Sequence, residues 1–301
     1  MSIVYTLNSP VVSNDTNLPI AVRDAVLKED NGGVRFLFDL GFGFCYPGGP
    51  YTGRPAAGQP GDGSLIADIA EIGNGSFVKS LGQTVDYAGG GFDFSTLTLA
   101  VTSLVIDPSN HVLAPAVWAG IQAEQKFMVA KYIKMPTSGD WNSSNTIFPF
   151  FASSSALTAY AEAADPVVLN MSATSGIQAR RQTAVGEHVA LSASQTAHYG
   201  LVTQVAFWRT ATETGLRLKS SAGTTLVTGA AGSLNAADCS ACLPRFGIVK
   251  PFTNFTIPEH RTARNFRMYR GWIENLALSG RSPAAVLDAD WDRVSARNVF
   301  S

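Results

Sequence analysis

Short runs of alternating apolar and polar residues recur along most of the chain, separated by Gly, Asn, Ser and Asp. An alternation with a period of two is typical of β-strands that are buried on one face. It predicts strands over residues 34–40, 91–95, 97–106, 127–135, 147–151, 187–191, 201–208, 215–220 and 224–228. The last two flank Ser221-Ala-Gly223, a hairpin signal with Gly where a positive φ is needed. Many short strands spaced by turns predict an all-β sandwich or barrel.

A clear helical pattern is confined to the C-terminal end. Ser282 is a candidate N-cap with Pro283 at the first helical position, and the apolar residues that follow share one face. This predicts a closing helix over 283–297. At the other end, polar turns and short ambiguous runs predict an N-terminal arm over 1–30, which leaves 31–301 as one sandwich domain. Gly and Pro supply about half of residues 41–63, which predicts a long surface loop.

The low fraction of charged residues and the near-zero net charge exclude one class of partner. Charged residues make up 15% of the 301 residues and the net charge is −1, whereas an average soluble domain is about 25% charged. We therefore expect no duplex nucleic acid as a partner. The chain shows no basic segment before an apolar run and no apolar run near the membrane-spanning length, so we expect synthesis in a cytoplasm and no membrane association. A sparsely charged surface favours a protein that is packed against neighbours.

Three cysteines are present, an odd number that argues against a disulfide framework. Cys239 and Cys242 have the spacing of half a zinc site or of a redox pair. The chain has no second pair, and the nearest histidine, His260, lies 18 positions further on. We expect small buried thiols in a loop.

Two parts of the sequence resemble the laminin-G-like, concanavalin A-like family. Residues 61–77, followed by 89–94, look like the family's opening, in which an Asp-containing strand and a Gly-Asn-Gly turn precede an aromatic strand. Residues 200–228, followed by 266–280, resemble its paired hairpins and its closing Gly-x-Ile-x-Asn-Leu strand. The resemblance covers about residues 60–295. It implies a concanavalin A-like jelly-roll β-sandwich with an N-terminal arm and a short C-terminal helix.

Candidate catalytic groups are few. The hydrolases of this family carry Glu-x-Asp-x-x-Glu on a strand, and this pattern does not occur here. Asp288, Asp290 and Asp292 supply carboxylates, but the predicted helix spreads them around its surface, so we interpret them as a solvated face with Trp291 turned inward. The four histidines, at positions 111, 188, 198 and 260, come without a Gly-x-Ser-x-Gly elbow and are expected as turn or strand residues. We expect no enzymatic activity, no catalytic residue and no cofactor.

A structural calcium ion is the one metal that the resemblance implies, because related domains bind it through an Asp and backbone carbonyls. Asp62, Asp68 and Asp107 are candidates, and their spacing selects none of them.

Two sets of residues are candidates for binding. Arg261, Arg264, Arg267 and Arg270 form the only basic cluster, interleaved with Phe266 and Tyr269, and predict either an interface patch or a solvated loop. Aromatic residues that would stack on sugar rings if exposed, and would otherwise belong to the core, are Tyr46, Tyr51, Trp118, Trp141 and Tyr160.

The leading hypothesis from these features is a non-enzymatic virion structural protein. A lectin-like sandwich with an arm and no export signal looks like the decoration, tail and fibre proteins of tailed bacteriophages. Such a protein would be located in the virion and would assemble with copies of itself and with other virion proteins, through the arm and residues 41–63. The alternative is a carbohydrate-binding module that attaches to host or surface glycans.

Overall fold

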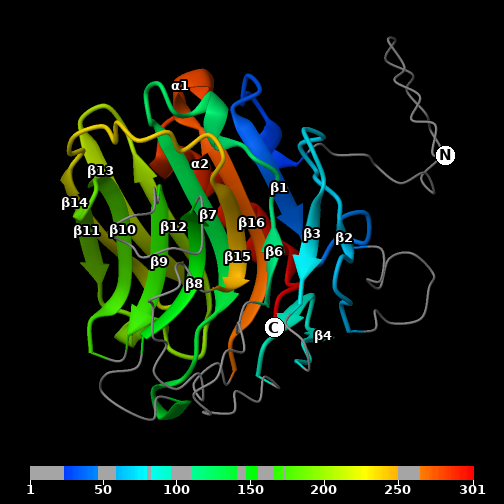
Figure 1. The fold of residues 1–301 in the computed structure, drawn as a ribbon. Coiled ribbons are helices and arrows are strands. Elements are labelled where there is room, and N and C mark those ends of the chain that lie inside the picture. The colour runs from blue at the N-terminus through cyan, green and yellow to red at the C-terminus, as the bar shows by residue number, and fades with distance from the viewer. Residues whose placement is uncertain are drawn as a thin grey trace, which may run out of the picture.

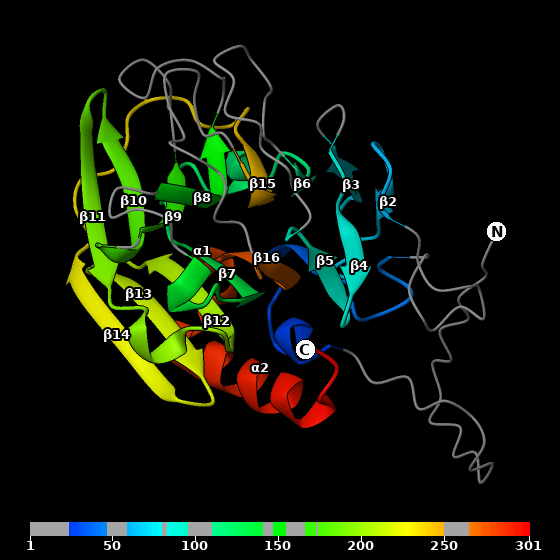
Figure 2. The same cartoon turned by 90° about the horizontal axis from the view of Figure 1, so that it is seen from below.

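The computed structural model describes residues 24–46, 59–79, 83–95, 110–140, 147–154, 166–172, 174–249 and 265–301. Two antiparallel sheets of eight strands each lie face to face, and a C-terminal helix covers the outer face of one of them (Figures 1 and 2). The prediction of an all-β sandwich with a short C-terminal helix is therefore confirmed.

The first sheet, called sheet A, carries the helix on its outer face. Its strands, in spatial order, are β14 (Gly223–Ala230), β13 (Glu213–Ser220), β12 (Val202–Arg209), β7 (Phe127–Lys134), β16 (Arg267–Asn275), β5 (Gly91–Asp93) and β4 (Asp86–Ala88), with β1 (Val34–Asp39) also paired to β16. The hairpin of β13 and β14 turns at Ser221 and Ala222, and Gly223 has a φ of 122°, as the sequence predicted.

The second sheet, called sheet B, closes the sandwich. Its strands, in spatial order, are β11 (Glu187–Ala193), β10 (Gly176–Ala184), β9 (Val167–Ser172), β8 (Ile147–Ser154), β15 (Leu243–Ile248), β6 (Asn110–Leu113), β3 (Gly75–Val78) and β2 (Leu65–Ile66). The strand predicted over 97–106 lies outside the described residues. The remaining elements are η1 (Ala25–Leu27), η3 (Trp118–Gly120), η4 (Ser138–Asp140), η5 (Thr196–His198), α1 (Leu276–Ser279) and α2 (Pro283–Arg297).

Alternation along the strands of sheet A produces two apolar layers. In β7, Phe127 and Val129 point into the core between the sheets, while Met128 and Ala130 point into a second layer beneath η1 and α2. Figure 2 shows α2 lying against this outer face. Trp272 of β16 is fully buried in the second layer. Because both faces are covered at the centre of the sheet, strands β7, β12 and β16 lack the polar face of an exposed antiparallel sheet.

The inner core has room for its aromatic rings because β16 carries a glycine at its centre. A Cβ atom at Gly271 would lie 2.8 Å from the Phe38 ring and 2.9 Å from the Phe246 ring. These two rings contact each other edge to face with their centroids 5.2 Å apart. Such close approach explains a glycine in a strand interior.

The boundary of the predicted arm requires correction. Residues 24–30 belong to the sandwich, because Val26 and Leu27 of η1 are buried in the layer beneath α2. Asp24 caps η1, its side chain accepting a hydrogen bond from the Val26 amide at 3.0 Å. Residues 1–23 lie outside the described part of the chain, as do residues 47–58 of the predicted loop; residues 41–46 of that loop form turns.

The closing strand is shorter than the resemblance over residues 266–280 implies. β16 ends at Asn275, whose side-chain oxygen accepts hydrogen bonds from the Ala277 and Leu278 amides at 2.9 and 3.4 Å and so starts α1. Leu276 and Leu278 therefore do not continue the strand. The closing helix α2 has the predicted bounds, with Pro283 at its first position. Ser282 occupies the N-cap position, but its side chain makes no capping hydrogen bond.

Candidate functional site

Helix α2 lies between two open clefts of similar size on the outer side of sheet A. The aromatic cleft has a volume of about 270 Å³, and from α2 it is lined by Trp291, Val294 and Ser295. The charged cleft has a volume of about 260 Å³, and from α2 it is lined by Arg293 and Arg297. Since these two sets of positions project from different sides of one helix, the helix separates the clefts.

Three rings build the aromatic cleft. Tyr132 of β7 is buried and forms the floor, and Trp291 of α2 stacks on it with the centroids 6.1 Å apart and the planes 11° apart. Phe300, which follows α2, lies 5.8 Å from Tyr132 and stacks on Tyr269 of β16. Trp291 and Phe300 are half-buried, so each ring presents part of its surface to the cleft. Half-buried rings of this kind combine a rigid apolar surface with access from solvent.

The rim of the aromatic cleft is polar and uncharged. Ser221 from the β13–β14 turn, Ser295 from α2 and Asn298 just after α2 line it and are exposed. The Ser295 hydroxyl donates to the Trp291 carbonyl at 2.7 Å, which leaves its oxygen able to accept a hydrogen bond. Asn298 is the C-cap of α2, with a φ of 49°. Of the described residues that line this cleft, none is charged.

Beside the aromatic cleft, two cations share one carboxylate. Asp288 accepts hydrogen bonds from Lys219 at 2.7 Å and from Arg217 at 2.5 Å. The hydrogen bond from Lys219 and the interactions with Arg217 lower the pKa of Asp288 despite some desolvation. The Lys219 ammonium lies 5.7 Å from the centroid of the Trp291 ring, within the range of a cation–π contact.

A buried guanidinium lies behind Asp24 and Asp39, two of the residues that line the charged cleft. Arg270 of β16 is fully buried and donates hydrogen bonds to Asp24 at 2.8 Å, Asp290 at 2.9 Å and Asp39 at 3.2 Å. Burial alone would lower the pKa of Arg270, but the carboxylates of Asp290, Asp24 and Asp39 together raise it well above its ordinary value. The guanidinium therefore stays charged.

Two further arginines complete this network from α2. Arg293 donates to Asp24 at 3.0 Å, and Arg297 donates to Asp39 at 2.6 Å. Desolvation would raise the pKa of Asp24, but Arg270 and Arg293 lower it below its ordinary value. Three arginines thus balance three aspartates, and the network joins η1, β1, β16 and α2.

The predicted arginine cluster does not form a surface patch in the described residues. Arg270 is buried in the network, which corrects its assignment as a candidate interface residue. Arg267 is partly exposed, and it donates to Asp93 at 2.6 Å and to the Ser301 carbonyl at 2.6 Å. Arg261 and Arg264 lie outside the described residues.

The predicted sugar-stacking residues that the structure describes are buried rather than exposed. Tyr46 is 6% exposed and packs edge to face on Phe92 with the centroids 5.0 Å apart. Trp118 is 3% exposed and packs edge to face on Phe127. Neither ring offers a face to a ligand, which corrects both assignments. The other candidates, at positions 51, 141 and 160, lie outside the described residues.

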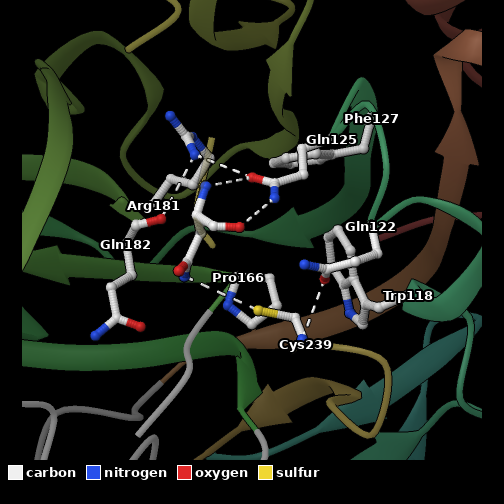
Figure 3. A pocket seen from close by; sticks show the side chains of 9 residues that line it. Trp118, Gln122, Gln125, Phe127, Pro166, Arg181, Gln182 and Cys239 are labelled. Carbon is white, nitrogen blue, oxygen red and sulfur yellow. Dashed lines mark hydrogen bonds between the residues drawn. The ribbon is translucent and has the colours of Figure 1, made fainter. Parts of the chain in front are cut away.

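Trp118 also lines a small internal pocket, which Figure 3 shows with Gln122, Gln125 and Cys239. Its volume is about 10 Å³, close to the smallest space that holds one water. Gln125 donates to the Asn235 carbonyl at 2.7 Å and accepts from the Asn235 amide at 2.9 Å. These hydrogen bonds hold the segment after β14 in place. The pocket itself is too small for an organic ligand.

The two cysteines of this segment are buried thiols, as expected. Cys239 and Cys242 are both buried, and neither forms a disulfide. The Cys239 amide donates to the Gln122 side chain at 3.1 Å, which holds the segment in place. Among the described residues, no three His, Cys, Asp or Glu side chains gather as the ligands of a metal ion would.

The candidate calcium ligands have other roles where the structure describes them. The carboxylate of Asp68 accepts hydrogen bonds from four backbone amides, those of Leu37, Ala70, Ile72 and Gly73, at 2.9–3.1 Å. Four N–H donors around one carboxylate disfavour a cation there, which corrects this candidate. Asp62 accepts from the Lys79 amide at 3.0 Å, and Asp107 lies outside the described residues.

The acidic residues of α2 are not one solvated face. Asp290 is fully buried at Arg270, whereas Asp288 and Asp292 are exposed, so the interpretation of this run is wrong for its central member. Asp290 falls four residues after Val286 and four before Val294, both buried, and this spacing is the signal that places it on the inner side of the helix. Trp291, expected to be turned inward, is instead half-buried at the cleft.

The histidines lie in strands or turns where they are described. His198 of η5 is buried, with its two ring nitrogens 2.8 Å from the Ser220 hydroxyl and 3.0 Å from the Thr225 hydroxyl. Burial lowers the pKa of His111 in β6 to about 3. His188 of β11 is exposed, and His260 lies outside the described residues. The described histidines therefore come from separate elements.

No protein-family model and no curated protein sequence matches the chain. Among solved structures, it is similar to the carbohydrate-binding module CBM40 of a Ruminococcus gnavus sialidase, bound to α2,6-sialyllactose. The TM-score is 0.38 and the identity 13%, over 57% of this chain and 86% of that one.

The chain is also similar to Trypanosoma rangeli sialidase in complex with sialic acid, with a TM-score of 0.42 and 13% identity over 87% of this chain and 36% of that one. A third similar structure is the binding domain of botulinum neurotoxin DC in complex with rat synaptotagmin II, with a TM-score of 0.49 and 9% identity, covering 88% and 52% of the two chains. These neighbours are lectin-like β-sandwiches. At TM-scores below 0.5 they carry no weight for function.

No helix in the described residues is both long and apolar enough to cross a membrane.

Proposed function

We propose that this chain is a non-enzymatic carbohydrate-binding domain that holds an uncharged sugar in the aromatic cleft. The observation that carries the proposal is the pair of half-buried rings, Trp291 and Phe300, beneath a rim of uncharged hydroxyl and amide groups. A sugar ring has an apolar C–H face that packs on aromatic rings, and hydroxyls around its edge that need hydrogen-bond partners. Sites for small molecules combine apolar walls with a few placed polar groups in this way.

The chemistry of the rim favours neutral over acidic sugars. An acidic sugar brings a carboxylate, which is recognised best by the paired N–H groups of arginine. The described arginines around the aromatic cleft are already engaged: Arg297, 5.6 Å from the centroid of the Phe300 ring, bonds Asp39, and Arg217 bonds Asp288. Ser221, Ser295 and Asn298 instead offer neutral donors and acceptors. The volume of about 270 Å³ lies just below the usual range of small-molecule sites, which suits a short glycan end better than a long chain.

The rim residue that can be removed with least disturbance is Asn298. Its left-handed backbone conformation is the one that glycine adopts most readily at a helix C-terminus, so Asn298→Gly deletes the amide and keeps the cap. The matched control is Glu71→Gly. Glu71 is exposed, has a φ of 59° and lies between β2 and β3, away from the aromatic cleft.

The test is binding of the full chain to an array of neutral and sialylated glycans, followed by calorimetry on the glycans that bind. We expect binding to neutral glycans, weakened about tenfold by Asn298→Gly, as the loss of one hydrogen bond of about 1–1.5 kcal/mol predicts. Glu71→Gly should bind as the unaltered chain does. Binding to sialylated glycans alone, or equal affinity for both variants, would contradict the proposal.

The virion role, with other virion proteins as partners and the virion as location, stays a prediction. Low surface charge supports it in general terms, as it did in the sequence. It is compatible with glycan binding, because a domain that attaches to surface glycans can be carried on a particle.

A further inference from the structure

We propose that the charged cleft is the docking site for residues 1–23 of a second copy of this chain, so that two copies exchange their N-terminal segments. This inference is independent of glycan binding, because it concerns the opposite side of α2 and different residues. It rests on where the described chain begins, on the surface of the cleft, and on the composition of the segment.

The described chain starts in the wall of the cleft. Asp24 lines the charged cleft together with Asp39, and 23 residues precede Asp24 in the sequence. A segment of that length spans up to about 75 Å when extended. If two copies face each other with these clefts, each segment begins next to the partner's cleft as well as its own. That arrangement is closed and twofold, which is the commonest symmetry of protein dimers.

The exposed surface at this cleft is apolar and aromatic. Phe42 lines the cleft and is 46% exposed, and Phe44 beside it is 55% exposed, with the two ring centroids 6.0 Å apart. Ile69 lines the cleft as well. Two neighbouring exposed phenylalanines are unusual on a free surface and are typical of one that receives a partner.

The composition of residues 1–23 matches this surface. Its charged side chains are Asp15 and Arg23, which cancel, and its remaining residues are a mixture of apolar and small polar types, with Ile3, Val4 and Leu7 near the start. The charges of the cleft are already paired within the network, so the cleft favours a neutral segment over a charged one. Apolar side chains from the segment can cover the exposed phenylalanine rings.

A second copy fits better than the chain's own segment because of the residues next to Asp24. Pro19 disfavours a helical conformation at Leu18, and residues 20–23, Ile-Ala-Val-Arg, include none of the residue types that form tight turns. The sequence therefore predicts an extended chain next to Asp24, and we expect an extended chain to reach a facing copy before it can reverse.

The test is sedimentation of the full chain, with Phe42→Asp as the variant and Leu278→Asp as its matched control. Leu278 is equally exposed, at 52%, but belongs to α1, and α1 packs beside Gly33 at the start of β1, whereas Phe42 follows the end of that strand. We expect a dimer for the unaltered chain and for Leu278→Asp, and dimer dissociation at least tenfold stronger for Phe42→Asp. A monomer at all concentrations, or equal dimers for both variants, would overturn the proposal.

Cross-linking separates exchange between copies from folding back within one copy. The natural cysteines that the structure describes are buried, so a thiol cross-linker about 10 Å long should react mainly with introduced cysteines. Mixing Phe42→Cys chains with Thr6→Cys chains should produce cross-linked pairs, whereas Leu278→Cys with Thr6→Cys should not. Cross-linking that occurs only within a chain carrying both substitutions would show that the segment covers its own cleft, which would overturn the exchange.

Discussion

The two clefts beside α2 have nearly the same volume and opposite chemistry. In the charged cleft the polar groups are arginines and aspartates that pair with one another beneath and along the helix. In the aromatic cleft the polar groups are hydroxyls and an amide at the rim, above rings that are only half-buried. Charge in a cleft therefore does not by itself indicate a ligand, because paired charges can hold a helix in place.

A local irregularity in β16 creates this division. The register between β16 and β7 shifts between Met268 and Arg270, so Tyr269 and Arg270 both face the layer beneath α2. Tyr269 then stacks on Phe300 at the aromatic cleft, while Arg270 reaches Asp290 and the charged cleft. A bulge commonly redirects side chains in this way. Because of this one extra residue, adjacent positions of β16 place the Tyr269 ring beside the aromatic cleft and the Arg270 guanidinium beside the charged cleft.

The largest expected effect on the free energy of unfolding separates the buried ion pairs of the charged cleft from the exposed ion pair beside the aromatic cleft. Arg270→Met removes the guanidinium and leaves three carboxylates in a desolvated site, so we expect a loss of about 3–5 kcal/mol in the free energy of unfolding. Lys219→Met on the aromatic side removes a partner of Asp288, whose side chain is 54% exposed, and should cost at most about 1 kcal/mol. Urea denaturation of both variants measures the difference.

A similar loss for both variants would contradict the division into a structural and an open side. A loss below about 1 kcal/mol for Arg270→Met would show that solvent reaches the network and that its charges are not fully buried.

Acid titration is expected to show a smaller effect of the same kind. The folded-state pKa of Asp24 is lowered, so the unfolded chain binds its proton at a higher pH than the folded chain does. The stability that this carboxylate contributes is therefore present above about pH 4 and is lost as the pH falls through the lowered pKa. Asp24→Asn should cost about 1.5–3 kcal/mol near pH 6, and this cost should shrink towards pH 2.

Asp288→Asn is the control, because the pKa of Asp288 is lowered as well but the Asp288 side chain is 54% exposed. Its cost should stay small at every pH, since solvent screens an exposed pair. Free energies of unfolding measured from pH 2 to 6 test both variants, and an Asp24→Asn cost that does not change with pH would contradict the assignment of this carboxylate to the buried network.

Much of the fold was predictable because its elements follow local rules. The closing helix has the predicted bounds 283–297 because Pro283 starts it, and the hairpin at Ser221 follows from the glycine after it. By contrast, β16 ends at Asn275 because the side chain of this residue caps α1. A single capping residue is a weaker sequence signal than the apolar alternation that continues to Leu278, so this end was not predicted.

The candidate site was less predictable, since exposure depends on which elements come together. Tyr46 and Trp118 have the residue types of sugar-stacking rings but are covered by distant strands and turns. Trp291 could be placed on a helix face from its spacing, but its partial exposure results from where α2 ends on sheet A. The position of Arg270 required the register shift in β16, which residue periodicity does not show.

The most direct test of the account is the indole N–H resonance of Trp291 during titration with neutral oligosaccharides, assigned by its disappearance in Trp291→Phe. We expect a neutral glycan to shift this resonance, while the signals of the buried Trp118 and Trp272 stay in place. The same shift should occur in Phe42→Asp, whose substitution lies in the other cleft. A glycan that binds without shifting the Trp291 signal, or the absence of binding to any neutral glycan, would contradict it.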